Sequence, residues 1–264
     1  MIDEDISPAG WRPPNLVGSL LTRANLRNRP TVLLFGEPCI IRGSGQLKVP
    51  DGSKRLLALV ALSRGGVDRR HAAGLLWPTG SDHHAAGCLR SALWRLKQAG
   101  LDILGSDNRV LSLQHGTIVD IGVVSEWATR LINGSATQDD LFVASWRGDT
   151  LDLLPDWSDD WVIFERERIR QRLLHALEAL SRQLSGVGRS ADAVDAAIWA
   201  VSADPLRESA NRVLIAAHLA EGNCVEARRA YQRYRDLVRR ELGIEPSEQL
   251  VSLEQETVRL QRRA

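Results

Sequence analysis

Residues 81–100 read SDHHAAGCLRSALWRLKQAG, and the interpretation of the whole chain starts from this stretch. Apolar residues recur in it at spacings of three and four, which predicts a helix with one apolar face. The apolar positions are Ala85, Leu89, Ala92, Leu93 and Leu96. Ser81 or Asp82 is expected to cap the start of this helix, and Gly100 to end it.

The other face of this helix carries positive charge, hydrogen-bonding groups and an aromatic ring, and no acid. It comprises Gly87, Arg90, Ser91, Trp94, Lys97 and Gln98, with Arg95 on the flank. A short, basic, capped helix with an apolar back suits insertion into the major groove of DNA. An amphipathic helix with a solvated basic face remains the simpler interpretation of this stretch taken alone.

Length and composition predict two domains of a soluble globular protein. The chain has 264 residues, of which 44% are hydrophobic and 25% charged. Its longest apolar run, residues 56–62, is too short to span a bilayer. The N-terminus carries acidic residues at 3–5 and no apolar core segment, so we expect no signal peptide, no membrane partner and a cytoplasmic location.

Charge is distributed unevenly along the chain. Residues 31–116 contain 11 Lys and Arg against 6 Asp and Glu, a balance of +5. Residues 117–264 contain 19 against 24, a balance of −5. This asymmetry supports a nucleic-acid-binding domain followed by a different kind of module.

The elements expected around the basic helix follow a recognisable order. Residues 1–30 are expected to form a flexible arm with a short helix at 16–26. Short strands at 32–35, 39–42 and 46–49 precede helices at 53–63 and 68–77, with Ser53 and Asp68 as caps. After the basic helix, strands at 101–104 and 109–113 flank a turn-rich tip at 105–108.

Three strands, three helices and a hairpin form the outline of a winged helix-turn-helix of the response-regulator effector type. In that architecture the third helix enters the major groove, and the tip of the hairpin lies along the DNA backbone or in the minor groove. Arg109 at this tip suits a phosphate contact. An exposed turn residue without a partner is the equal alternative for Arg109.

The second half of the chain predicts an all-helical domain with an internal repeat. Pairs of like residues are 34 positions apart, a period typical of tetratricopeptide-like helix pairs. These pairs are Leu180 and Leu214, Gly188 and Gly222, and Ala193 and Ala227. We expect helix pairs at 160–205 and 206–246, a capping helix at 248–262, and a shorter pair within 120–148.

No residue constellation supports an enzyme, a cofactor or a metal site. Cys39, Cys88 and Cys224 lack redox or metal-ligand spacing and are interpreted as structural thiols. His83 and His84 are adjacent, so they point about 100° apart on a helix and do not readily share one ion. The sequence also lacks a phosphate-binding loop and a nucleophile elbow.

Several runs resemble one known family. LLFGEPCIIRGSGQLKVPDGSKRLLALVAL at 33–62, AAGLLWP at 72–78 and CLRSALWRLK at 88–97 resemble the DNA-binding domain of SARP-type regulators, the antibiotic regulatory protein family of bacterial transcriptional activators. LLPDWSDDWVIFERERIRQRLLHALEAL at 153–180 is similar to the bacterial transcriptional activator domain of the same family. Residues 203–223 and 227–247 match that domain too.

The resemblance implies a sequence-specific DNA-binding transcriptional activator. A winged helix-turn-helix at 31–116 would bind double-stranded DNA at promoters, and the tetratricopeptide-like domain at 117–264 would form a homodimer on repeated sites or contact RNA polymerase. We expect Arg95 and Ser91 to contact base edges. Phosphates are expected to be neutralised by Arg90, Lys97, Lys54 and Arg109.

Trp94 departs from the family pattern, which has a small or basic residue at this position. Its ring would either stack on a sugar or thymine methyl group, or mark a surface that faces a protein. The alternative function is therefore a protein–protein interaction module built on the helical repeats, with weak or no DNA binding.

Overall fold

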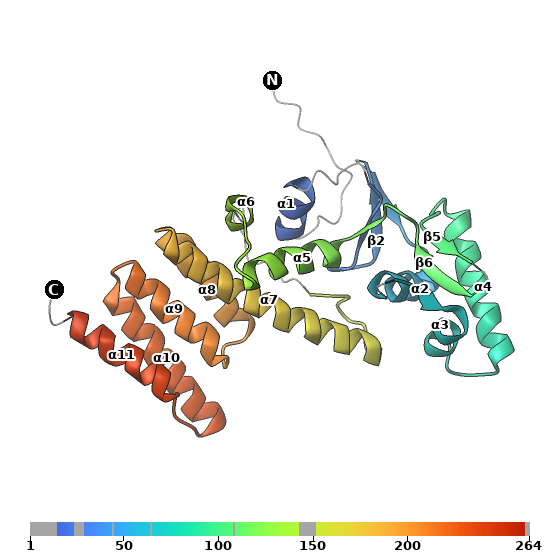
Figure 1. Ribbon diagram of the computed structural model, residues 1–264. Helices are drawn as coiled ribbons and strands as arrows, with labels where there is room; N and C mark the ends of the chain where they lie inside the picture. Colours follow the sequence, from blue (N-terminus) through green and yellow to red (C-terminus); the bar gives the residue numbers. More distant parts are fainter. Residues whose placement is uncertain are drawn as a thin grey trace. The chain divides into compact units, whose positions relative to one another are not determined.

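The computed structural model describes residues 15–23, 29–43, 45–63, 65–107, 109–142 and 152–261. The fold is mainly helical with two small sheets, as the sequence predicts (Figure 1). Contacts within the chain define two compact units. Of the described residues, the first unit contains those up to 124 and those from 152 to 166, and the second contains 125–142 and 167–261.

A four-stranded sheet in the order β3-β2-β1-β7 forms part of the first unit. Its strands are β1 (Thr31–Leu33), β2 (Cys39–Arg42), β3 (Gly45–Lys48) and β7 (Ile118–Val119). The first three strands pair antiparallel and confirm the predicted strands, while β7 pairs parallel to β1 on its other side. The strand β7 was not predicted, because two residues are too few to show an alternating pattern.

Three helices follow β3 and confirm the predicted order. They are α2 (Asp51–Leu62), α3 (Arg69–Leu76) and α4 (Asp82–Gln98). The carboxylate of Asp68 caps α3 by accepting hydrogen bonds from the backbone N–H groups of Arg70 and His71. The prediction that Ser53 caps α2 is wrong, because α2 begins two residues earlier and Ser53 lies inside it.

Both ends of α4 are closed as its sequence predicts. The hydroxyl of Ser81 accepts a hydrogen bond from the backbone N–H of His84, 3.3 Å away. At the other end Gly100 adopts a positive φ of 71°, and the N–H of Leu101 donates to the carbonyl of Leu96 at 3.0 Å. This is the Schellman arrangement, which satisfies the last carbonyl groups of a helix.

A second sheet, in the order β4-β6-β5, contains the predicted hairpin. Its strands are β4 (Val67–Asp68), β5 (Leu104–Ser106) and β6 (Val110–Leu113). The first strand lies later than the predicted 101–104, because β5 begins at Leu104 and Leu101 is buried before it. The carbonyl of Ile103 also accepts a hydrogen bond from the N–H of Gln114 at 2.8 Å. The tip is correspondingly shorter, and the carboxylate of Asp107 accepts hydrogen bonds from the N–H groups of Arg109 and Val110 there.

The part of the expected arm that the structure describes includes a packed helix. Helix α1 (Asn15–Arg23) confirms the helix predicted at 16–26. Leu16, Val17, Leu20 and Leu21 are all buried, so this segment is not a flexible arm. Residues 1–14 and 24–28 lie outside the described residues.

Asp120, the first residue of α5 (Asp120–Ile132), is a fully buried carboxylate. It accepts hydrogen bonds from the backbone N–H groups of Leu34 at 2.7 Å, Phe35 at 2.9 Å and Ile121 at 2.7 Å. Burial raises the pKa of Asp120 to about 6, while the hydrogen bonds from Phe35, Leu34 and Ile121 act in the opposite direction. Asp120 thus joins the end of β1 to the start of α5.

The first unit extends beyond the domain boundary expected after residue 116. Its sheet includes β7, and the backbone next to β1 also pairs with a later segment. Gly36 donates to the carbonyl of Asp152 at 3.1 Å, and Leu154 donates to the carbonyl of Leu34 at 3.0 Å. Hydrogen bonds between residues so distant in sequence leave no local pattern, so the sequence did not predict this extension.

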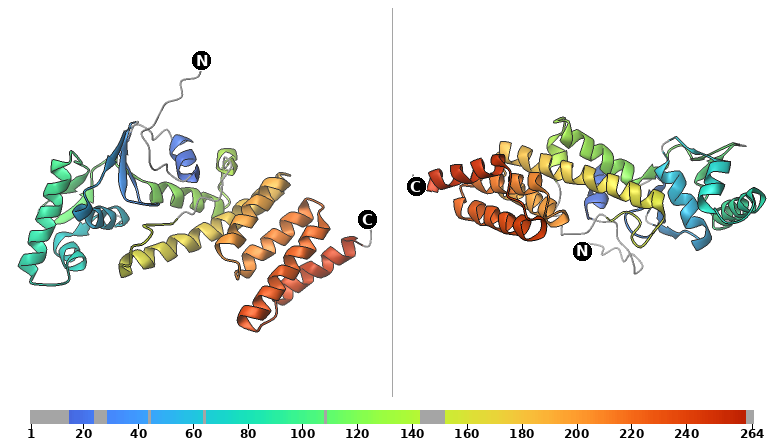
Figure 2. Two further views of the ribbon diagram at one scale, coloured as in Figure 1. Left: turned by 180° about the vertical axis from the view of Figure 1, so that it is seen from behind. Right: turned by 90° about the horizontal axis from the view of Figure 1, so that it is seen from below.

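The second unit consists of helices. They are the later part of α5, α6 (Gln138–Leu141), the later part of α7 (Asp160–Gly186), α8 (Ser190–Ala203), α9 (Glu208–Ala220), α10 (Cys224–Leu242) and α11 (Glu248–Gln261). Helices α8, α9, α10 and α11 lie side by side in chain order (Figures 1 and 2). Helices α7 to α11 lie at the positions predicted for the segments 160–205, 206–246 and 248–262.

The repeat of 34 residues is visible in the backbone. Gly188 and Gly222 have positive φ angles of 78° and 79°, and each follows the end of a helix. In both, the glycine N–H donates to the carbonyl three residues before it. Ala193 and Ala227 are both fully buried, as expected for small residues at a helix crossing.

Within the part of the chain that the structure describes, no helix is both long and apolar enough to cross a membrane.

The buried Asp120 predicts a pH dependence of stability. Because its pKa is higher in the folded state than the usual value near 3.9, the folded state binds the proton more readily. The contribution of Asp120 therefore favours folding at low pH and is lost as pH rises through about 6. Relative to Asp120→Asn, wild type should lose about 2 kcal/mol of unfolding free energy between pH 4.5 and pH 7.

Urea denaturation of the two proteins at several pH values measures this difference. If wild type instead gains stability relative to Asp120→Asn as pH rises, the backbone hydrogen bonds outweigh burial and the assignment is reversed.

Candidate nucleic-acid interface

Packing against α2 and α3 fixes the orientation of α4. The predicted apolar face is confirmed, with Leu93 half-buried and the other four positions buried: Ala85, Leu89, Ala92 and Leu96. The buried hydroxyl of Ser53 on α2 donates to the backbone carbonyl of Ala92 at 2.8 Å. This hydrogen bond ties the middle of α4 to α2 and leaves the opposite face open.

The open face of α4 carries unpaired positive charge. Arg90, Ser91, Trp94 and Lys97 are exposed, and 62% of Trp94 is accessible to solvent. Among the described residues, none forms a hydrogen bond or an ion pair with the side chains of Arg90 or Lys97. These two cations are therefore available to an anionic partner.

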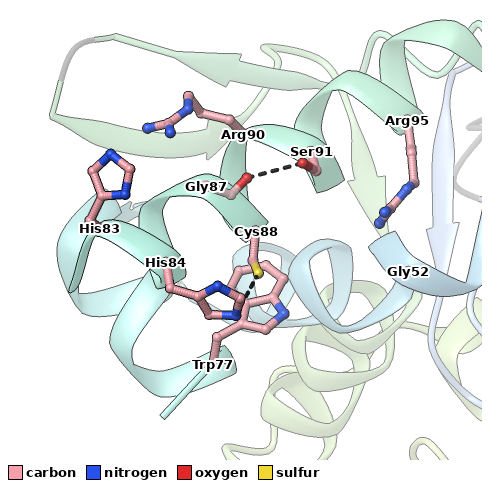
Figure 3. Close-up of a pocket in the computed structure, with 9 residues that line it drawn as sticks. All are labelled: Gly52, Trp77, His83, His84, Gly87, Cys88, Arg90, Ser91 and Arg95. Atoms are coloured by element: carbon pink, nitrogen blue, oxygen red, sulfur yellow. Dashed lines mark hydrogen bonds between the residues drawn. The ribbon is translucent and has the colours of Figure 1, made fainter. Parts of the chain in front are cut away.

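Ser91 uses its proton within the helix. Its hydroxyl donates to the carbonyl of Gly87 one turn earlier, at 3.1 Å (Figure 3). The lone pairs of the hydroxyl oxygen remain exposed. Towards a partner, Ser91 therefore presents a hydrogen-bond acceptor.

Arg95 lies on the flank of α4 and points towards α2 (Figure 3). The guanidinium of Arg95 lies so close to Gly52 that a Cβ added to Gly52 would collide with the guanidinium. Gly52 belongs to the first turn of α2, where unpaired backbone N–H groups and the helix dipole favour an anion. Arg95 is thus placed beside a helix N-terminus rather than on the centre of the open face.

Lys54, predicted to neutralise a phosphate, is paired within the chain. Its ammonium group contacts the carboxylates of Glu37 and Asp51, and only 15% of its side chain is exposed. The hydrogen bonds to Asp51 and Glu37 raise the pKa of Lys54 above its usual range. Its charge is already balanced, so a phosphate would gain less from Lys54 than from Arg90 or Lys97.

Arg109 stands at the tip of the hairpin with 88% of its side chain exposed. Its Nε atom lies 3.8 Å from the carboxylate of Asp68, a weak ion pair at a solvent-exposed position. The backbone of Arg109 is held firmly, because its N–H donates to Asp107 and its carbonyl accepts from the N–H of Arg69. The guanidinium is therefore carried on a fixed backbone and is accessible to a partner.

A groove of about 640 Å³ lies along the first turns of α4 (Figure 3). Its lining includes two guanidinium groups, two imidazoles and an indole ring, and no carboxylate. The lining residues are Gly52, Trp77, His83, His84, Gly87, Cys88, Arg90, Ser91 and Arg95. Such a surface suits a partner that presents negative charge and hydrogen-bonding edges.

One histidine of this groove contacts a cysteine. Nε2 of His84 lies 3.5 Å from the sulfur of Cys88, one turn along the helix. In the described part of the chain, no three His, Cys, Asp or Glu side chains are grouped as metal ligands.

Trp77 and Gly52 line the groove but were not among the predicted site residues. Pro78 follows Trp77 and α3 ends at Leu76, so the indole lies where α3 turns towards α4. The Trp-Pro pair at the end of a helix was a usable signal for this position. No signal in the sequence marked Gly52, because its proximity to Arg95 depends on how α2 packs against α4.

Comparison with known proteins agrees with this arrangement. Residues 140–258 match the family model of the bacterial transcriptional activator domain. A solved structure of Mycobacterium tuberculosis EmbR in complex with low affinity phosphopeptide shares the fold, with a TM-score of 0.68 and 20% sequence identity. The likeness covers 88% of this chain and 65% of the EmbR chain. No curated protein matches the sequence.

The fold and the matched domain define a class of protein: a winged helix-turn-helix followed by a bacterial transcriptional activator domain. Residues 140–258 therefore contain the activator domain that the sequence resemblance predicted, and the fold agrees with that resemblance.

Proposed function

We propose that this protein binds specific promoter sequences through α4, which enters the major groove. The open face of α4 supports this function most, because it combines unpaired Arg90 and Lys97 with no carboxylate between residues 87 and 98. The winged helix-turn-helix fold presents this helix with its apolar back buried, as groove insertion requires. The DNA that it regulates lies in the cytoplasm, where we expect the protein to act.

The positions of the side chains suggest a division of roles. Arg90 and Ser91 are nearer the N-terminus of α4, where a helix of this type reaches base edges. Arg95 and Lys97 would contact phosphates along the flanks, and Arg109 at the hairpin tip would contact the backbone or the minor groove. This differs from the sequence-based assignment, in which Arg95 reads a base and Arg90 and Lys54 contact phosphates.

The helical unit would serve assembly at the promoter. It exposes apolar side chains, among them Ile198 on α8, Val225 on α10 and Ile244 in the loop after α10. We propose that these helices mediate self-association on repeated sites or contact RNA polymerase. Both roles are consistent with a transcriptional activator family and are proposed for this chain on that basis.

A protein–protein interaction module is the second candidate, and Trp94 supports it. A tryptophan that is 62% exposed on the open face is a typical anchor of a protein interface. An electrophoretic shift on the DNA upstream of the protein's own gene, at two salt concentrations, separates the two functions. Salt-sensitive binding at nanomolar protein supports DNA recognition, while no shift at either salt supports the interaction module.

The roles of Arg90 and Arg95 are distinguished by selection from a randomised DNA library. Arg90→Ala should abolish base preference at one position and weaken specific binding by about 1–3 kcal/mol. Arg95→Ala should weaken binding to all sequences alike and leave every base preference in place. If Arg95→Ala abolishes one base preference and Arg90→Ala weakens binding to all sequences alike, Arg95 is the residue that contacts a base edge.

Lys97 should contribute one phosphate contact to the affinity. Lys97→Ala should reduce the slope of log K against log salt by about one, because one fewer counterion is released. Lys54→Ala is the matched control, since Lys54 is already paired with Asp51 and Glu37 and its loss should change the slope much less. Fluorescence anisotropy over a salt series measures both slopes; equal slopes for Lys97→Ala and wild type would remove Lys97 from the interface.

A further inference from the structure

Gly87 lies in the middle of α4, where glycine is an unfavourable residue. A glycine inside a helix destabilises it relative to alanine, because the unfolded backbone loses more conformational freedom. Glycine is often retained where the backbone needs a positive φ, but Gly87 is not among the residues with positive φ. The conformation of α4 therefore does not require it.

Packing within the chain does not require a glycine at position 87 either. A Cβ at Gly87 would meet only Nη2 of Arg90, at 3.7 Å, which is an ordinary contact. The contrast with Gly52 is clear, because there a Cβ would collide with Arg95. Nothing among the described residues thus explains why position 87 lacks a side chain.

The surroundings of Gly87 indicate that this residue faces a binding partner. It lines the groove on α4, with His83 one turn before it and Arg90 and Ser91 about one turn after it (Figure 3). No side chain projects from the backbone of α4 at Gly87, and the neighbouring side chains donate or accept hydrogen bonds. A partner can therefore come closer to the helix axis at Gly87 than at its neighbours.

We propose that Gly87 is the point where α4 approaches the bases most closely, and that Ser91 beside it selects a base with an exocyclic amino group. Ser91 presents an acceptor there, because its proton is donated to the carbonyl of Gly87. In the major groove, adenine offers N6 and cytosine offers N4 as donors. The base pair at Gly87 is thus read through the exocyclic amino group of its adenine or cytosine. This inference rests on the proposed function.

The first test compares Gly87→Ala with Gly74→Ala in the full chain. Gly74 is a matched control, since it lies in α3, is exposed, and a Cβ there would meet nothing within 4 Å. Both substitutions should raise Tm by about 2–4 °C, because each replaces a helical glycine with alanine. Gly87→Ala should also weaken binding to the selected DNA site at least tenfold, whereas Gly74→Ala should bind as wild type does.

The second test uses selection from a randomised library with Ser91→Ala. Ser91→Ala should lose the base preference of wild type at one position while retaining the preferences at the others. If Ser91→Ala keeps every base preference of wild type, the role of Ser91 is refuted.

The two tests separate this inference from the proposed function. If wild type selects no DNA sequence, the proposed function fails and the inference with it. If wild type selects a site and Gly87→Ala binds it equally well, the close approach at Gly87 is refuted while DNA recognition stands.

Discussion

The burial of the apolar face of α4 decides which of its side chains can meet a partner. Leu89, Ala92 and Leu96 pack inward, and the hydrogen bond from Ser53 to the carbonyl of Ala92 fixes the rotation of the helix. A rotation of α4 about its axis would bury Arg90 or Lys97 without a counterion, at a cost of several kcal/mol. The basic face is therefore exposed because the core allows no other orientation.

Pairing within the chain then separates cations that hold the fold together from cations that face outward. Lys54 is engaged by Glu37 and Asp51, while Arg90 and Lys97 have no partner among the described residues. A net charge alone does not make this distinction. Arg90 and Lys97 on α4 are thus available to an anionic partner, whereas Lys54 is not.

Local patterns predicted most of the fold, and long-range contacts account for the rest. The face and both ends of α4, and the repeat at Gly188 and Gly222, are set by residues within a few turns of one another. In contrast, the pairing of β7 with β1 and the burial of Asp120 join segments about 85 residues apart. For the site, residue types on the open face were predictable. The contact of Lys54 with Glu37 depends on how α2 packs against the turn between β1 and β2, and the place of Arg95 over Gly52 depends on how α2 packs against α4.

Methylation interference on a selected DNA site tests whether α4 lies in the major groove. Dimethyl sulfate modifies N7 of guanine, an acceptor in the major groove. With α4 in the groove, guanines methylated at N7 opposite α4 should be missing from the bound DNA. Bound and unbound DNA with the same pattern of N7 methylation across the whole site would contradict it.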